Sequence, residues 1–182
     1  MENDDEEYSD RYFQDLETPM HLIEEGLYLG SIDAARDREL LKQNNITRVL
    51  SLLDSFPDSK PSGNSEYDED CYYYLRPFDS SFDHLKLTIQ DSYTSNLIQH
   101  LPAALKFISD SQKAQKNILV HCAAGISRSS SVVIAYIMVK YSLSLQEGIH
   151  IVKDKRRCIC PNDGFKRQLM IVRTENFKQY IE

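Results

Sequence analysis

The segment from residue 118 to residue 141 constrains this chain more than any other. Residues 118–120, Ile-Leu-Val, predict a short buried strand, and residues 130–141 are apolar over a length that predicts a helix. The residues between them must therefore form a strand-to-helix turn. Backbone N–H groups in such a turn, together with the positive end of the following helix, favour a bound anion and phosphate in particular.

Three residues of this turn suit phosphate chemistry. Cys122 lies at the strand exit, where the same positive field favours a thiolate nucleophile. Arg128 lies at the helix start, and its guanidinium can bind two phosphate oxygens at once. Gly125 lets the backbone approach the anion without a side chain in the way. The alternative is a buried, unreactive thiol, the usual state of a free cysteine, but the combined pattern favours a phosphate site.

The pattern His-Cys-x-x-Gly-x-x-Arg-Ser resembles the signature of the cysteine-based protein tyrosine phosphatases. Its variable positions make it most similar to the dual-specificity branch, in the small, single-domain atypical form: Ala123, Ala124, Ile126 and Ser127. The resemblance implies that the N–H groups of residues 123–128 and the Arg128 side chain bind phosphate oxygens. It also implies that Ser129 stabilises the departing thiolate and that His121 tunes that thiolate through its backbone and ring contacts.

Length and composition are those of one globular domain that binds no membrane. The chain has 182 residues, no apolar run of membrane-spanning length, and an acidic start unlike a signal peptide. We therefore expect an intracellular protein, in the cytoplasm or also in the nucleus. The cysteines fit neither a disulfide framework nor a zinc site, which favours a reducing compartment: Cys71, Cys122, Cys158 and Cys160. A reversible disulfide between Cys122 and another thiol stays open.

The net charge of −7 is divided unevenly along the chain. Residues 1–20 carry eight acids and one base, residues 21–70 eleven acids and five bases, and residues 71–182 nine acids and fifteen bases. The half that contains the signature is thus basic and suits an anionic substrate. The overall acidity argues against general nucleic-acid binding.

Residues 1–19 are dense in acids and lack hydrophobic periodicity, so we expect a disordered or loosely held tail before a catalytic domain over residues 20–182. The tail is either a solvated terminus with no task or a brake. As a brake, its acids, Tyr8 and Tyr12 would compete with phosphoprotein for the basic half. Residues 54–70, rich in acids, proline and serine, predict a surface loop.

Strand and helix patterns alternate along the rest of the chain. We expect a strand or hairpin at residues 20–30, one or two short helices at 33–44, a strand at 46–53, a helix at 97–108, and helices that begin after Ser144 and Asn162. This order predicts an α/β fold with a central, mostly parallel twisted sheet of four to five strands flanked by helices, as in protein tyrosine phosphatases.

Asp91 is the candidate general acid. Residues 72–75 and 84–89 compete for the strand before it, and we prefer the second because it leads directly into Asp91. The aspartate loop of dual-specificity phosphatases lies at about this position. Asp79 and Asp83 are rivals by residue type, but they lie on the other side of the strand. An aspartate before a serine is also common in plain turns.

The run Pro-Asn-Asp-Gly-Phe at residues 161–165 resembles the closing motif of the same family. The resemblance implies that Asn162 supports the phosphate loop and that Arg157, five residues earlier, meets a second phosphate of the substrate. The alternative for Arg157 is a solvated basic turn. Cys158 and Cys160 are expected to pack rather than to bind metal.

The expected reaction is hydrolysis of phosphotyrosine, phosphoserine or phosphothreonine in a phosphoprotein, through a phosphocysteine intermediate and without metal or cofactor. The loop has neither the lysines of phosphoinositide phosphatases nor the filling found in RNA triphosphatases. The alternative is a weakly active or inactive phosphoprotein-binding pseudophosphatase, although the usual mark, loss of the cysteine or arginine, is missing. The sequence specifies neither the phosphoprotein nor the oligomeric state.

Overall fold

The structure of the protein, a computed structural model, describes residues 2–56, 82–172 and 174–182. Its elements in chain order are α1 (Glu2–Glu17), β1 (Met20–Glu24), β2 (Leu27–Gly30), α2 (Ile32–Arg36), α3 (Arg38–Gln43), β3 (Ile46–Leu53), β4 (Asp83–Thr88), η1 (Ile98–His100), α5 (Leu101–Lys113), β5 (Asn117–His121), α6 (Arg128–Tyr141), α7 (Leu145–Lys155), α8 (Asp163–Ile171), α9 (Thr174–Phe177) and η2 (Lys178–Tyr180).

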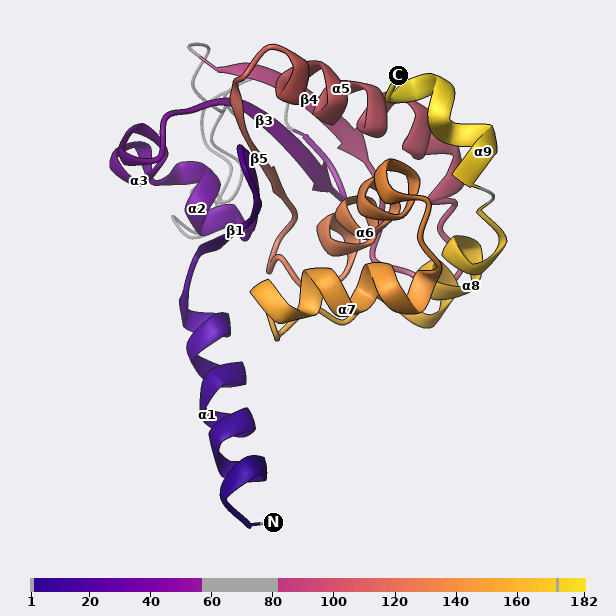
Figure 1. Ribbon diagram of the computed structural model, residues 1–182. Coiled ribbons are helices and arrows are strands. Elements are labelled where there is room, and N and C mark those ends of the chain that lie inside the picture. Colours follow the sequence, from indigo (N-terminus) through magenta and orange to yellow (C-terminus); the bar gives the residue numbers. More distant parts are fainter. Residues whose placement is uncertain (1, 57–81, 173) are drawn as a thin grey trace, which may run out of the picture.

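The described strands form one twisted sheet in the order β1-β2-β5-β3-β4 (Figure 1). β1 and β2 are an antiparallel hairpin, whose turn contains Gly26 at φ +74°. The β2–β5, β3–β5 and β3–β4 pairs are parallel. The predicted mostly parallel α/β sheet is confirmed, and the strand preferred before Asp91 forms as β4. The competing residues 72–75 lie outside the described residues.

Helices cover both faces of this sheet because alternate residues of each strand point to opposite sides. On one face Leu50 and Leu52 of β3 pack with the buried side chains of α5 and α6. On the other face Val49 of β3 and Leu119 of β5 pack against α2 and α3. β5, the strand that leads into the signature, is therefore shielded on both faces.

α6 is the buried helix behind the signature turn, as its nearly continuous apolar sequence predicts. Its side chains from Arg128 to Val139 are buried along the whole stretch. In the described part of the chain, no helix on its own is long and apolar enough to cross a bilayer; α6 and α7 pass that test only as a pair bent by 119°.

Residues Glu2–Glu17 of the N-terminal segment form helix α1, which extends away from the sheet (Figure 1). The helix ends where the Thr18 hydroxyl donates to the Gln14 carbonyl at 2.9 Å and Pro19 follows. Asp15 joins this end to His21 of β1, with Oδ1 and Nε2 3.2 Å apart. Hydrophobic periodicity could not reveal this long-range polar contact. The domain boundary at residue 19 stays a prediction.

Candidate active site

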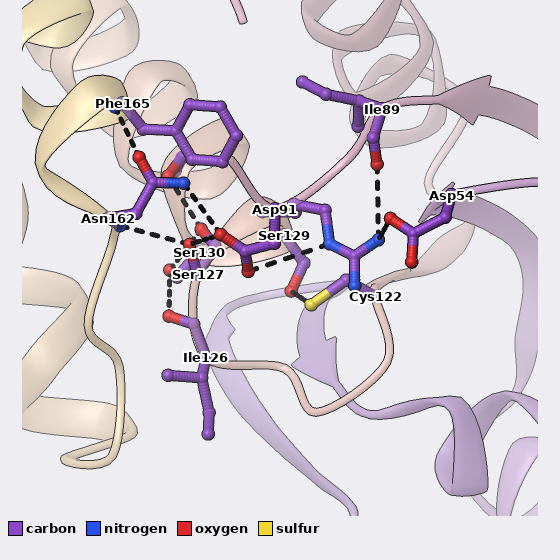
Figure 2. A network of polar contacts seen from close by, with 12 residues as sticks. Asp54, Ile89, Asp91, Cys122, Ile126, Ser127, Ser129, Ser130, Asn162 and Phe165 are labelled. Atoms are coloured by element: carbon purple, nitrogen blue, oxygen red, sulfur yellow. Dashed lines mark hydrogen bonds and ion pairs between the residues drawn. The ribbon is translucent and has the colours of Figure 1, made fainter. Parts of the chain in front are cut away.

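The signature forms the predicted strand-turn-helix unit, because β5 ends at His121 and α6 begins at Arg128. Cys122 starts the turn and is only 2% exposed. Its Sγ accepts a hydrogen bond from the Gly125 N–H at 3.3 Å. It accepts a second one from the Ser129 hydroxyl at 3.2 Å (Figure 2). Both donors point at the sulfur of the residue that the sequence marks as the candidate nucleophile; that role stays a prediction.

Every backbone carbonyl of residues 122–127 is held by a donor on the outer side of the turn, which we call the phosphate loop. Those of Cys122 to Ser127 accept, in order, from His121 Nδ1 (3.1 Å), the Ile32 N–H (3.0 Å), Arg156 Nη2 (3.2 Å), Arg156 Nε (3.1 Å), the Cys160 N–H (2.9 Å) and the Ser131 N–H (2.9 Å). The peptide bonds are trans, so each N–H points away from its carbonyl. The N–H groups of residues 123–128 therefore face the concave side.

Both the backbone conformation and the lack of space for a side chain require glycine at position 125. Its φ of +71° lies in the left-handed region, which disfavours any residue with a side chain. A Cβ atom at Gly125 would also lie 2.6 Å from the backbone carbon and oxygen of Gly30, at the end of β2. The neighbouring strand thus presses against the loop from outside.

A buried chain of hydrogen bonds orients His121. The Cys122 carbonyl can only accept, so His121 Nδ1 carries the proton, and in the neutral ring Nε2 accepts from the Ser51 hydroxyl at 2.5 Å. Ser51 Oγ in turn accepts from His84 Nε2 at 2.7 Å. Burial lowers the pKa of His121 to about 3 and that of His84 to about 4, which keeps both rings neutral. Sequence patterns did not identify Ser51 and His84 as partners of His121, because both are far from it in the chain.

Arg128 is almost completely buried, with 6% of its side chain exposed, and it lies between the carboxylates of Asp54 and Asp91. Nη1 donates to Asp54 Oδ1 at 2.8 Å and to the Ile89 carbonyl at 3.2 Å. Nε is 3.8 Å from Asp91 Oδ2 and makes no hydrogen bond to any described residue. The guanidinium thus has a donor left for a phosphate oxygen.

Asp91 lies at the edge of the phosphate loop. Its Oδ1 accepts from the Ser127 hydroxyl at 2.8 Å and from Asn162 Nδ2 at 2.7 Å. Asn162 also accepts the Phe165 N–H at 2.9 Å, which caps α8, and its own N–H donates to Ser127 Oγ at 3.1 Å. The structure therefore brings Asp91, Asn162 and the loop together. The rival Asp83 instead pairs with Arg48 at 2.8 Å, and Asp79 lies outside the described residues.

Asp54 is a site residue that the sequence analysis missed, because it began a segment interpreted as a surface loop. The signal was its position directly after the β3 strand. The carboxyl ends of neighbouring parallel strands meet at one edge of a sheet. β3, β4 and β5 accordingly bring Asp54, Asp91 and Cys122 to the same edge.

Arg156, rather than its neighbours in the Lys-Arg-Arg run, contacts the phosphate loop. It is 0% exposed. It is the residue directly after α7, where the backbone becomes extended with φ −138° and ψ 97°. Sequence spacing did not distinguish it from Arg157. Arg157 is half-buried, and its backbone N–H donates to Asp15. Its contact with a second phosphate stays a prediction.

Two other described cysteines are free thiols: Cys158 is buried and Cys160 is exposed. The expectation that both pack is therefore correct for Cys158 and wrong for Cys160. Cys71 lies outside the described residues. Within residues 2–56, 82–172 and 174–182, no three histidine, cysteine or carboxylate side chains are grouped so that they could hold a metal ion.

Comparison with known proteins agrees with this geometry. The family model described as "Dual specificity phosphatase, catalytic domain" matches residues 27–175. The chain belongs to this family. The matched region contains the whole phosphate loop together with Asp54, Asp91 and Asn162.

Individual relatives support the same assignment. The chain is 38% identical over 156 residues to dual specificity protein phosphatase 22-B of Danio rerio, which covers 86% of this chain and 75% of that protein. The crystal structure of DUSP15 superposes with a TM-score of 0.75 at 27% identity, covering 89% of this chain and 94% of that one. A human tyrosine phosphatase-like serine/threonine/tyrosine-interacting protein superposes with a TM-score of 0.71 at 30% identity, covering 90% and 98%.

Proposed function

We propose that this dual specificity phosphatase is an active protein phosphatase that hydrolyses phosphotyrosine and phosphoserine or phosphothreonine through a phosphocysteine intermediate. The observation that supports this most directly is the position of the Cys122 thiol within the phosphate loop. Cys122 Sγ accepts two hydrogen bonds at the centre of a loop whose N–H groups face inward. Such fixed donors stabilise negative charge without a metal ion.

In the first step the phosphate dianion binds to the inward N–H groups of residues 123–128 and to the guanidinium of Arg128. The phosphate replaces Asp54 as the partner of that guanidinium. The Cys122 thiolate attacks phosphorus in line, so that an S–P bond forms while the bond from phosphorus to the leaving oxygen breaks. Asp91 gives its proton to that oxygen, and the dephosphorylated side chain leaves.

In the second step water attacks the phosphocysteine. Asp91 now accepts a proton from the water, and inorganic phosphate forms as the S–P bond breaks. The departing thiolate of Cys122 is stabilised by the Ser129 hydroxyl and the Gly125 N–H, which already donate to the sulfur. The enzyme returns to its starting state, in which Cys122 is a thiolate and Asp91 carries a proton.

The substrate class rests on charge and shape. The half of the chain that holds the site has fifteen bases and nine acids, which suits an anionic protein segment. Ala123, Ala124 and Ile126 add no charge to the loop, which favours phosphoprotein over phosphoinositide. The relatives printed as dual specificity protein phosphatases support the same class.

One observation favours a second function, a weakly active or inactive phosphoprotein-binding protein. Asp91 Oδ1 already accepts from Ser127 and Asn162, and Oδ2 faces Arg128. Asp91 must give up at least one of these contacts before it can reach a leaving oxygen. A protein in which it does not do so would bind phosphoprotein and turn it over slowly.

Turnover on two substrates tests the proposal. The wild-type protein should hydrolyse both p-nitrophenyl phosphate, whose leaving group needs little acid catalysis, and phosphopeptides. Cys122→Ser should reduce both by a factor on the order of 10⁴ to 10⁶ while phosphopeptide binding persists. Fast hydrolysis of the aryl ester with none of phosphopeptides would favour the binding function, and no turnover of either substrate would end the phosphatase proposal.

A further inference from the structure

We infer that Arg156, held by Thr18 and His21 of the N-terminal segment, with Asp15 behind His21, is a positioning residue that fixes the direction of the phosphate-loop N–H groups. The role rests on the proposed function, because it concerns the site of that reaction. Arg156 does not touch substrate in this role. It acts on the loop from the side opposite to the phosphate.

The contacts of Arg156 show why one side chain has this effect. Nε donates to the Gly125 carbonyl at 3.1 Å and Nη2 to the Ala124 carbonyl at 3.2 Å. The other loop carbonyls are held by backbone N–H groups or by the adjoining His121 ring. Residues 124 and 125 alone depend on a side chain from a distant part of the chain.

Holding these two carbonyls sets two donors on the concave side. The peptide that contains the Ala124 carbonyl also contains the Gly125 N–H, and the next peptide contains the Ile126 N–H. The Gly125 N–H is the group that reaches Cys122 Sγ at 3.3 Å. If Arg156 released the carbonyls, these peptides could rotate and the thiolate would lose a donor.

The N-terminal segment in turn holds the guanidinium. Nη1 of Arg156 donates to the Thr18 carbonyl at 2.9 Å and to His21 Nδ1 at 2.8 Å. Since an arginine only donates, His21 Nδ1 is unprotonated, and its Nε2–H faces Asp15 Oδ1 at 3.2 Å. Burial, and then the charge of Arg156, lower the pKa of His21, so the ring remains a neutral acceptor.

Burial lowers the pKa of Arg156, and the negative charge of Asp15 acts in the opposite direction. Asp15 also accepts the Arg157 N–H, and its carbonyl accepts from Cys158 Sγ at 3.7 Å. These contacts fasten the end of α1 to the loop between α7 and α8. Asp15, Thr18 and His21 all precede residue 27, where the family match begins. Support for the catalytic loop therefore comes from outside the matched region.

The positioning role and the brake hypothesis predict opposite changes in activity when the contacts of the N-terminal segment are weakened. A brake that competes with substrate would raise activity when it is weakened, chiefly through a lower KM. A support for the loop would lower kcat when it is weakened, because the loop N–H groups bind the charge that develops in the transition state.

The experiment uses three substitutions in the full chain. Arg156→Lys keeps the charge, but a single ammonium cannot replace the guanidinium fork on two carbonyls. Asp15→Asn removes the counter-charge without altering the buried arginine. Asp10→Asn, an exposed carboxylate on the same helix, is the matched control. Each protein is measured for p-nitrophenyl phosphate kinetics, tungstate affinity by calorimetry, and iodoacetamide alkylation of Cys122 against pH.

We expect Arg156→Lys to lower kcat about 10- to 100-fold, the scale of a slightly misplaced reacting geometry, with a smaller change in KM. Asp15→Asn should lower kcat about fivefold, the scale of one weakened hydrogen bond. Both should weaken tungstate binding and move Cys122 alkylation to higher pH. Asp10→Asn should match wild type within about twofold.

Other outcomes separate the two proposals. If the wild-type protein hydrolyses no phosphate ester, the phosphatase proposal fails, while tungstate affinity and alkylation still test the role of Arg156. A lower melting temperature with wild-type kcat, tungstate affinity and alkylation would show that Arg156 serves stability alone. If Arg156→Lys does not fold, Asp15→Asn decides, and values equal to those of Asp10→Asn would overturn the inference.

Discussion

The two faces of the phosphate loop are held in different ways. On the concave face the carboxylate partners of Arg128 are Asp54 and Asp91, whose side chains are 64% and 36% exposed. On the outer face the side chains that donate to the loop carbonyls are all fully buried: His121, Ser130, Ser131 and Arg156. Exposed contacts exchange at little cost, whereas buried polar ones are expensive to break. The substrate side can therefore rearrange while the supporting side stays fixed.

The largest expected effect comes from replacing the guanidinium of Arg128, the side chain proposed to bind phosphate on the concave face. Arg128→Lys keeps a positive charge but loses the paired donors, so kcat/KM should fall about 10²- to 10³-fold. Steady-state kinetics on p-nitrophenyl phosphate measure the loss. Because the outer face is intact, Cys122 should still be alkylated by iodoacetamide, and loss of that reaction as well would mean that the two faces are not separable.

Asp91 tests whether the concave face rearranges. Asp91→Asn removes the acid, so kcat on phosphopeptides should fall about 10²-fold, whereas p-nitrophenyl phosphate with its good leaving group should lose much less. The ratio of the two losses is the measurement. Equal losses on both substrates would mean that Asp91 holds Ser127 and Asn162 in place rather than donating a proton.

The pH dependence of stability tests the outer face. The pKa of His121 is about 3 and that of His84 about 4 in the folded protein, both below their unfolded value of 6.5. As pH falls below 6.5, these two histidines bind protons in the unfolded chain but stay neutral in the folded protein. The free energy of unfolding therefore falls toward pH 4. A shielded histidine contributes up to about 1.4 kcal/mol per pH unit, and half-buried His84 contributes less.

Urea unfolding between about pH 6.5 and 5 measures that slope. His84→Gln removes one of the two proton-binding groups while its amide can still donate to Ser51, so its stability should depend less steeply on pH than that of the wild type. An unchanged slope would show that His84 titrates normally and that the chain from His84 through Ser51 to His121 does not fix the neutral rings.

Asp54 gives the smallest expected effect. It competes with phosphate for Arg128 from an exposed position, so Asp54→Asn should tighten inorganic phosphate binding severalfold, or about 1 kcal/mol at most for an exposed pair. Inhibition by inorganic phosphate measures the change, with Asp110→Asn, a carboxylate paired on the surface of α5, as the control. A large loss of kcat instead would show that Asp54 takes part in the chemistry.

The sequence predicted what short stretches encode. Apolar patterns and turn residues placed the sheet, the buried helix α6 and the cap at Asn162, while the signature located Cys122, Gly125, Arg128 and Ser129. The resemblance to a family placed Asp91, and the structure confirms its position next to the loop. Its role as acid stays a prediction.

What escaped prediction depends on contacts between distant residues. Asp54 looked like the start of a polar loop, and only the shared edge of the parallel strands brings it to Arg128. Arg156 and Arg157 are identical in type, and the direction of the chain after α7 decides which is buried. Helix α1 is attached through Asp15, a polar contact that hydrophobic periodicity does not report.

The bond from Arg156 to Thr18 joins residues 138 positions apart. Arg156 follows the phosphate loop in the chain, so the carbonyls of residues 124 and 125 gain this partner only when the segment after α7 packs against both the loop and the N-terminal segment. Contacts between residues so far apart form late in folding, because closing the long stretch of chain between them costs entropy. We therefore expect the phosphate-loop N–H groups to reach their final directions only when the domain has folded as a whole.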